Sequence, residues 1–314
     1  MKNGEIWLDD RGNPIQAHGG MITRFGGKWY WYGENKSAEN IPGTTRVDVI
    51  GISCYTSRDL VNWHCEGNVL SADAKDPSAV LHPSRVVERP KVIYNEKTGR
   101  YIMWFHADAP DYTQAMAACA VSDSPSGSFR LVGSGQPNRL DCRDMTLFVD
   151  ADQQAWLVHS GNWNKTLYFS RLTDDYLGFT GEYYAAFADQ EREAPALFHD
   201  HGQYYCITSG CTGWQPNPAL YGTSRHIACG WKLIDNPCRG MTAHKTFGGQ
   251  SACVFEANHR FYLLLDHWKP TRLKESGYSI LPIDVRDGCI AIRWHKEFNG
   301  VNETYDHESC SARL

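Results

Sequence analysis

Apolar runs alternate with polar turns along most of the chain, and a longer unit built from them recurs five times. In each unit an apolar run leads into a polar turn and then into an aromatic-rich run, which is the pattern of a β-hairpin. Helical periodicity is scarce throughout. The five hairpin segments read MITRFGGKWYWYG, KVIYNEKTGRYIMWF, MTLFVDADQQAWLVHS, APALFHDHGQYYCITSG and SACVFEANHRFYLLLD.

The five segments superpose without gaps at their starts. One column of this superposition precedes a shared apolar position by four residues. Its five members are called the strand-start residues below. They recur about every 50 to 70 residues, which is a spacing typical of propeller blades. The strand-start residues are His18, Glu88, Asp144, Glu193 and Gln250.

Five units of about four strands predict an all-β fold, a five-bladed β-propeller. A second hairpin-like signal, such as GISCYTSRDLVNW, follows most of the segments and supplies the remaining strands. A β-sandwich is the alternative, but its strands do not normally repeat in register five times. No Pro/Ser-rich linker divides the chain, so residues 1–314 are expected to form one domain. The segment EIWL (5–8) is expected to close the ring by adding a strand to the last blade.

The strand-start residues should meet at one mouth of the central channel, because the first strand of each blade lines it. Three of them are carboxylates, and like charges in a confined site should raise at least one pKa. A raised carboxyl pKa suits a general acid, and carboxylates across a sugar-sized cleft suit a glycosidase. Taken singly, each is more often a solvated or salt-bridged loop residue, but the register shared by all five units favours a role in chemistry for Glu193 and Asp144. Side chains alternate along a strand, so the neighbouring arginines are expected on the opposite face: Arg89, Arg143 and Arg192.

Composition narrows the function classes. The chain has 11 Trp, 16 Tyr and 12 Phe, which suits stacking on sugars but equally suits a β-rich core. A net charge of −5 without a basic stripe argues against nucleic-acid binding. No apolar run is long enough to span a membrane, and no apolar stretch follows the N-terminus as in a secretory signal. A cytoplasmic location is therefore expected, although a trimmed piece of a secreted protein would give the same pattern.

The 11 cysteines form no C-x-x-C pair, so neither a zinc ribbon nor a thioredoxin-type motif is supported. Mostly reduced, buried thiols are expected in a cytoplasmic protein, with one or two disulfides left open. No oxygen-rich D-x-D-x-D-G loop is present. We therefore predict no metal and no cofactor.

Several long strings together resemble glycoside hydrolase family 43, over nearly the whole chain. The combination is most similar to the subgroup of exo-acting galactan 1,3-β-galactosidases. The resemblance implies a five-bladed propeller and an inverting reaction, in which an acid protonates the leaving oxygen and a base activates water. The strings are WYWYGENK (29–36), ERPKVIYNEKTGRYIMWFH (88–106), RDMTLFVD (143–150), REAPALF (192–198) and GGQSACVF (248–255).

The resemblance also assigns roles to individual residues. Glu193 matches the general acid, and Asp144 matches the carboxylate that orients it and adjusts its pKa. The usual base, an aspartate in the first blade, is missing from IQAHGG (15–20). In the galactanase-like subgroup a glutamine that matches Gln250 is proposed to hold the water, and a glutamate that matches Glu88 to bind a sugar hydroxyl. Glu88 also remains a competing base.

Other residues are candidates for substrate binding. Trp214 is either a stacking platform for the sugar or a core tryptophan. His18 could face substrate, water or an ion in the channel. The others are polar residues near the expected mouth, for which a solvated loop is the alternative: Thr212, Asn162 and Asn164, Glu34 and Asn35, His106 and Asp108.

The predicted function is an inverting glycoside hydrolase that releases terminal galactose from β-1,3-galactan or its oligosaccharides. Residues 1–314 are expected to be its catalytic domain, without an appended carbohydrate-binding module. Its partner is a galacto-oligosaccharide, with no nucleic acid and no membrane. An α-L-arabinofuranosidase or β-D-galactofuranosidase on the same fold is the alternative enzyme. A non-catalytic sugar-binding propeller is the alternative of another class, motivated by the missing aspartate of the first blade.

Overall fold

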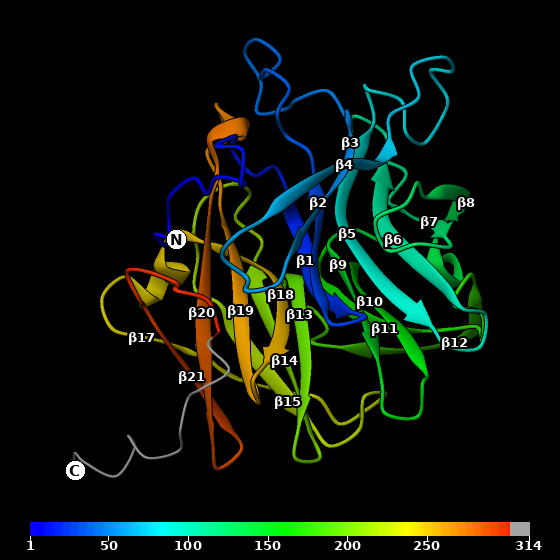
Figure 1. The fold of residues 1–314 in the computed structure, drawn as a ribbon. Helices are drawn as coiled ribbons and strands as arrows, with labels where there is room; N and C mark the ends of the chain where they lie inside the picture. The colour runs from blue at the N-terminus through cyan, green and yellow to red at the C-terminus, as the bar shows by residue number, and fades with distance from the viewer. Residues whose placement is uncertain (302–314) are drawn as a thin grey trace.

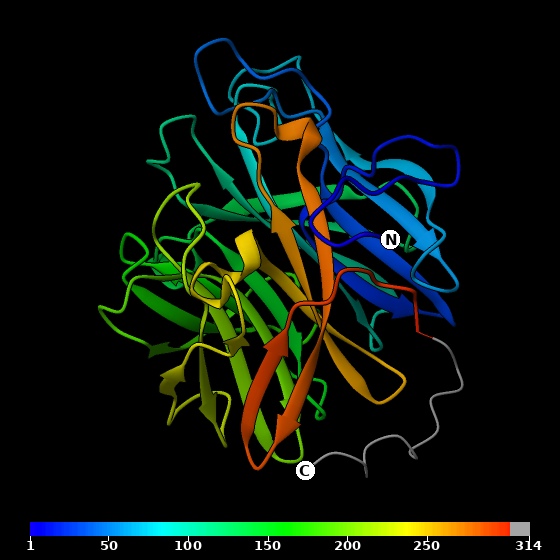
Figure 2. The same cartoon turned by 90° about the vertical axis from the view of Figure 1, so that its left-hand side faces the viewer.

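Five β-sheets surround a central channel in the computed structural model, which describes residues 1–301 (Figures 1 and 2). This arrangement confirms the predicted five-bladed β-propeller. In the first four blades the strands follow chain order from the channel outward. Blade one holds β1 (His18–Phe25), β2 (Lys28–Glu34), β3 (Gly51–Ser57) and β4 (His64–Ser71). Blade two holds β5 (Val86–Asn95), β6 (Arg100–Asp108), β7 (Met116–Ser122) and β8 (Arg130–Gly135).

The other three blades repeat this plan with one variation. Blade three holds β9 (Met145–Val149), β10 (Ala155–Gly161), β11 (Thr166–Leu172) and β12 (Phe179–Ala186). Blade four holds β13 (Arg192–Asp200), β14 (Gln203–Gly210), β15 (Leu220–Ser224) and β16 (Lys232–Asp235). Blade five holds β18 (Gln250–Ala257), β19 (Arg260–His267), β20 (Gly277–Arg286) and β21 (Cys289–Arg293), with the short β17 (Cys238–Arg239) added in parallel at its outer edge. Three 3₁₀ turns lie between strands: η1 (Pro137–Arg139), η2 (Ala243–Gly248) and η3 (Leu273–Glu275).

The ring is closed by the innermost strands, because β18 of blade five lies against both β13 of blade four and β1 of blade one. The segment EIWL approaches blade five as expected, but it does not form the predicted strand. Glu5 makes only an isolated bridge to Tyr278, and Gly4, in a left-handed conformation with φ 82°, turns the chain just before it. Trp7 instead inserts its ring into the core.

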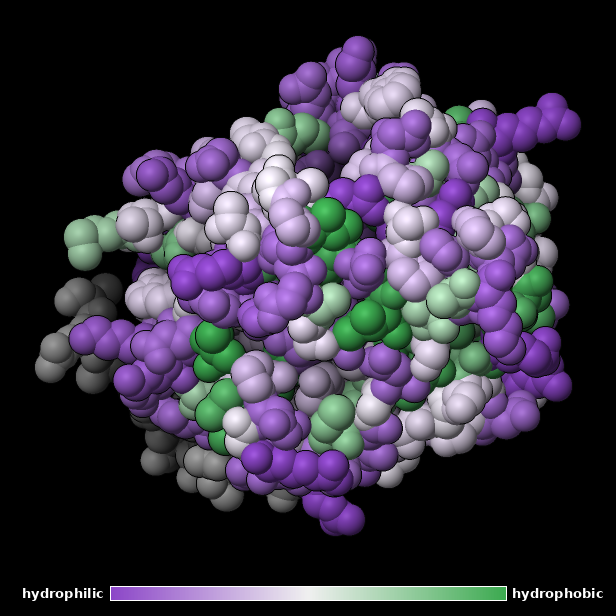
Figure 3. Space-filling view, turned by 90° about the horizontal axis from the view of Figure 1, so that it is seen from above, coloured by the Kyte–Doolittle hydropathy of each residue, from purple (hydrophilic) through white to green (hydrophobic). Residues whose placement is uncertain are grey.

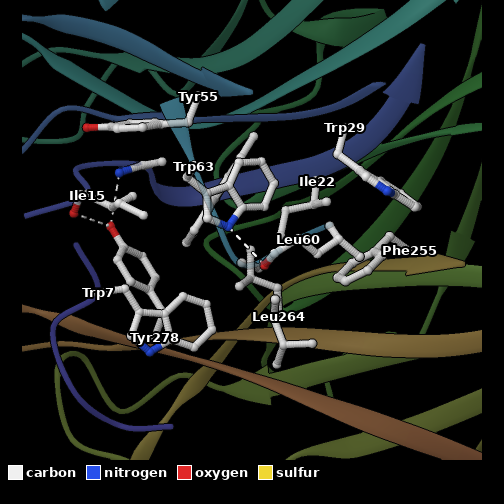
Figure 4. Packing of buried hydrophobic residues seen from close by; sticks show 14 of the residues in the cluster. Trp7, Ile15, Ile22, Trp29, Tyr55, Leu60, Trp63, Phe255, Leu264 and Tyr278 are labelled. Carbon is white, nitrogen blue, oxygen red and sulfur yellow. Dashed lines mark hydrogen bonds between the residues drawn. The ribbon is translucent and has the colours of Figure 1, made fainter. Parts of the chain in front are cut away.

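Each of the five buried apolar clusters fills the space between two adjacent blades. The cluster between blades one and five is rich in aromatic rings (Figure 4). Trp31 and Trp63 are fully buried there, and the ring of Trp31 lies 4.7 Å from that of Tyr278 in an edge-on contact. The high aromatic content is therefore used largely in the core.

A register irregularity follows the start of four of the five innermost strands. After three strand-start residues the next residue has a left-handed φ: Gly19 (56°), Arg89 (56°) and Ala194 (51°). Such bulges interrupt the alternation of side chains along a strand. At Gly19 no side chain would fit, because a Cβ would lie 2.2 Å from Oε1 of Glu34.

Two further features bear on the expectations from sequence. Ten of the eleven cysteines lie in the described part of the chain and all ten are free thiols, whereas Cys310 lies outside it. Among residues 1–301 no helix is long and apolar enough to cross a membrane.

Candidate active site

A cavity of about 410 Å³ opens at the end of the channel where the innermost strands begin. Figure 3 looks down on this loop-bearing end, whose surface is predominantly hydrophilic. Four of the five strand-start residues line the cavity. The complete lining is Glu34, Glu88, Arg89, His106, Tyr112, Arg143, Asp144, Asn164, Glu193, Gly213, Trp214, Gln250 and Trp268.

His18 is the strand-start residue that does not line the cavity. Its side chain is fully buried, with Nδ1 3.1 Å from Oδ1 of Asp266 and Nε2 3.1 Å from the hydroxyl of Tyr278. Both ring nitrogens therefore have protein partners. The expectation that His18 contacts substrate, water or an ion is not met, because Asp266 and Tyr278 of blade five enclose its ring. No cluster of His, Cys, Asp and Glu able to hold a metal ion occurs within residues 1–301.

Arg89 occupies the centre of the site, which corrects the expectation that it faces away. Its guanidinium binds both carboxylate oxygens of Asp144, at 3.0 and 2.8 Å. It also donates to Oε1 of Gln250 at 2.7 Å and to the carbonyl of Ser251 at 3.0 Å, while its backbone N–H donates to Glu34. Regular alternation would exclude this position, and the bulge after Glu88 allows it. One signal in the sequence could have placed Arg89 in the site: several buried carboxylates need a cation nearby.

Gln250 is held by four protein groups. Its Oε1 accepts from Arg89 and from Nε1 of Trp268 at 2.9 Å, and its Nε2 donates to Glu193 at 3.1 Å and to Ser209 at 3.0 Å. Arginine and the indole N–H only donate, so the amide oxygen must face them. The amide orientation is thereby determined, and the amide N–H₂ points at Glu193. Trp268 was not identified from the sequence.

Glu193 is a half-buried carboxyl group on β13. Burial raises its pKa to about 8, the negative charge of Asp144 adds to the rise, and the positive charge of Arg89 opposes it. Its Oε1 accepts from Gln250, and its Oε2 accepts from Nδ2 of Asn164 at 3.3 Å. This carboxyl group is therefore mostly protonated at neutral pH, as the sequence predicted for one member of the cluster.

Glu88 has the opposite character. Burial alone would raise its pKa, but the hydrogen bond and charge of His106, the charge of Lys36 and the hydrogen bond of Tyr112 outweigh burial and lower it to about 2. The His106 ring lies 3.2 Å from one carboxylate oxygen, and the Tyr112 hydroxyl donates to the other at 2.8 Å. Glu88 is thus ionised at neutral pH. Tyr112 lies in the loop after β6 and carries no pattern that would have singled it out.

His106 connects Glu88 to Asp108, which is fully buried. Its Nε2 donates to Asp108 at 3.0 Å, and the other oxygen of Asp108 accepts three backbone N–H groups. Burial opposes the charged form of His106, but the hydrogen bonds to Asp108 and Glu88 raise its pKa to about 9. His106 is therefore a cation that holds Glu88 in place, rather than only a contact for substrate. Glu34, paired with Lys36 at 2.8 Å, forms the neighbouring wall.

The remaining candidates lie in or near the loops at the cavity end of the blades, and only some of them line the cavity. Trp214 stands in the cavity wall, where its indole donates to Thr45 at 3.0 Å and packs edge-on against Trp268 at 5.5 Å. Thr212 is exposed and hydrogen-bonds within its own loop, so it does not line the cavity. Asn164 lines the cavity. The cavity lining does not include Asn162, Asn35 or Asp108.

Comparison with known proteins identifies relatives of this chain. The family described as Glycosyl hydrolases family 43 matches residues 11–237. A comparison with curated protein sequences gave no match. Among solved structures, a family 43 β-1,3-galactosidase with galactodeoxynojirimycin is 37% identical, covers 95% of this chain and 100% of that one, and superposes with a TM-score of 0.90.

Two exo-β-1,3-galactanases are also similar. The one from Phanerochaete chrysosporium, solved with β-1,3-galactotriose, is 33% identical over 93% of this chain and 66% of its own, with a TM-score of 0.85. The one from Clostridium thermocellum is 33% identical over 93% of this chain and 64% of its own, with a TM-score of 0.83. The chain thus spans about two thirds of the length of these two galactanases.

The raised pKa of Glu193 predicts how the pH dependence of protein stability changes when glutamine, which has nearly the same shape, replaces this glutamate. The folded pKa, about 8, exceeds the ordinary value of 4.5. The stability contributed by the proton is therefore fully present below about 4.5 and is lost as the pH rises through 8. Glu193→Gln keeps a neutral group at every pH. The melting temperature of the variant minus that of the wild type should therefore increase as the pH rises from 5 to 9. A melting-temperature difference that stays constant with pH would contradict the raised pKa.

Proposed function

Because the chain belongs to family 43 of the glycosyl hydrolases, we propose that it is an inverting β-1,3-galactosidase that releases terminal galactose from β-1,3-galactan or its oligosaccharides. The observation that carries the proposal is a pair of cavity glutamates with opposite pKa shifts. Glu193 has a pKa of about 8 and Glu88 of about 2. An acid and a base that act at the same pH must have pKa values that lie apart in this way.

In the proposed reaction Glu193 is the general acid. Its proton is retained at neutral pH and is available to the oxygen of the leaving sugar. Asp144, next to it, provides the negative charge that favours this protonated state. Arg89 holds both oxygens of Asp144, so the tuning carboxylate has one orientation and cannot turn toward the acid.

For the attack on the sugar we propose that Gln250 holds the water and that Glu88 accepts its proton. Gln250 cannot itself take up the proton, because a carboxamide is far too weak a base. Its contribution is to position the water. All four of its hydrogen-bonding positions are occupied by protein groups, so a sugar that enters the cavity must first displace one of these contacts, such as that to Glu193. Glu88 is ionised and each of its oxygens accepts one hydrogen bond from His106 or Tyr112, which leaves lone pairs for a water or a sugar hydroxyl.

The structural neighbours support galactose as the sugar, since one is named a β-1,3-galactosidase and another was solved with β-1,3-galactotriose. The Trp214 and Trp268 rings offer apolar surface in the cavity wall. A non-catalytic binder would have no use for a protonated Glu193 beside a carboxylate, Asp144, that favours its protonated state. Cleavage of arabinofuranosides or galactofuranosides is the competing outcome of the assays below.

The direct test is hydrolysis of β-1,3-galactobiose followed by NMR. The wild type should release galactose first as the α-anomer, because inversion converts the β-linkage. Glu193→Gln should lower kcat by about 10²–10⁴, since it removes proton donation. Glu191→Gln is the matched control: Glu191 is exposed, lies two residues away and should retain full activity. Turnover of an arabinofuranoside with galactobiose untouched would refute the proposed substrate.

The pH dependence of kcat/KM follows from the same two groups. Activity should fall as the pH rises through about 8, because Glu193 then loses the proton it must donate. Ionisation of Glu88, with a pKa of about 2, should not limit activity above pH 4. Stopped assays from pH 4 to 10 would measure this profile. An activity that increases above pH 8 is incompatible with Glu193 as the acid.

Replacement of Glu88 tests its role as base. Glu88→Gln should lower kcat by about 10²–10⁴ with a modest change in KM. Added azide, which needs no base, should restore turnover and give galactosyl azide of inverted configuration. A variant with raised KM, nearly unchanged kcat and no response to azide would show that Glu88 only binds a sugar hydroxyl.

A further inference from the structure

Trp163 is a tryptophan that the function proposed above does not use, although it stands next to the cavity. It is 69% exposed, the highest exposure of any tryptophan in the described part of the chain. The ring lies in the loop between β10 and β11, one residue before Asn164, which lines the cavity. A single exposed apolar residue is common and proves nothing alone. The surroundings of Trp163 distinguish it.

The ring is held in place although it is exposed. The guanidinium of Arg143 lies 4.5 Å from its centroid on one face. Arg143 is itself buried and paired with Asp141, and Asp141 also accepts the backbone N–H of Trp163 at 2.9 Å. One face of the indole is thus covered by a fixed cation, and the other is left for a ligand.

The backbone of the same loop adopts an unusual conformation. Asn162, Trp163 and Asn164 have successive φ values of 50°, 57° and 62°. Three consecutive left-handed residues that are not glycine are rarely populated, and such segments persist where surrounding contacts impose them. Here the carboxylate of Asp141 holds the start of the loop, and Asn164 reaches the acid at its end. The loop therefore presents Trp163 at a set position relative to Glu193.

The contact between Asn164 and Glu193 determines which sugar would meet the ring. A general acid must lie beside the oxygen that joins the terminal galactose to the leaving sugar. Nδ2 of Asn164 is 3.3 Å from Oε2 of Glu193, so the loop stands on the acid's side of the cavity. Trp163 itself is not part of the cavity lining, but it directly precedes Asn164, which is. If the terminal sugar occupies the cavity, the sugar that reaches Trp163 is the leaving one.

We propose that Trp163 is the binding platform for the leaving-group sugar, a pyranose that lays its apolar C–H face on the free face of the indole. Galactopyranose suits such a surface, because its axial O4 leaves the hydrogens of C3, C4 and C5 together on the opposite face. Burial of that patch against the ring removes apolar surface from water. The assignment of the occupant rests on the proposed function, since it takes Glu193 to be the acid.

Two substrates separate this role from a purely structural one. β-1,3-Galactobiose has a leaving sugar, whereas β-D-galactosyl fluoride has none. Trp163→Ala should raise KM or lower kcat/KM for galactobiose by about ten-fold or more, and should change the rate with the fluoride by less than about two-fold. Trp163→Phe, which keeps a ring, should recover much of the loss. Tyr183→Ala is the matched control, an exposed aromatic of the same blade outside the cavity lining, and should change neither rate.

Equal losses on both substrates would overturn the proposal, because they would show that Trp163 only supports Arg143 and Asn164. Unchanged rates on both would overturn it as well. A wild type that cleaves neither substrate would refute the proposed function instead. Calorimetry would then still test the platform, since binding of galactobiose that is independent of Trp163 contradicts it.

Discussion

The buried guanidinium of Arg89 is the interaction on which the site depends. Carboxylates taken out of water need a partner, and a buried charge left without one is strongly destabilising. Arg89 extends from blade two to Asp144 of blade three and Gln250 of blade five, and its backbone N–H binds Glu34 of blade one. One residue therefore joins four blades at the mouth of the channel. The positions of the Asp144 carboxylate and of the Gln250 amide follow from it.

The same geometry gives two cavity glutamates different protonation states. Glu193 lies near the negative Asp144 and accepts hydrogen bonds from two neutral amides, so burial prevails and its carboxyl keeps a proton. Glu88 receives hydrogen bonds from a histidine cation and a phenol, and these outweigh burial. Two side chains of one chemical type thus differ in charge at neutral pH because of their neighbours.

Much of this could be predicted from the sequence, because a repeat in register converts distant residues into neighbours. The propeller and the convergence of Glu88, Asp144, Glu193 and Gln250 follow from that register alone. The errors have local causes. Arg89 was placed on the wrong face because bulges interrupt alternation, and bulges leave little trace in a pattern of apolar residues. His18 was expected in the cavity, but partners from another blade enclose it. Tyr112, Trp268 and Trp163 lie outside the repeating positions.

The closure between blades one and five has a consequence for how the protein gains its activity. Every other blade contacts the next one along the chain, but here β1 packs on β18, and the N–H of Ile22 meets the sulfur of Cys253 from 231 residues away. Contacts between such distant residues close late in folding, because the chain entropy lost on closure is large and must be offset at once. Gln250 stands on β18, beside this seam. A refolding chain would therefore regain its sheet structure before its catalytic power, and enzymatic turnover would report the moment at which the ring closes.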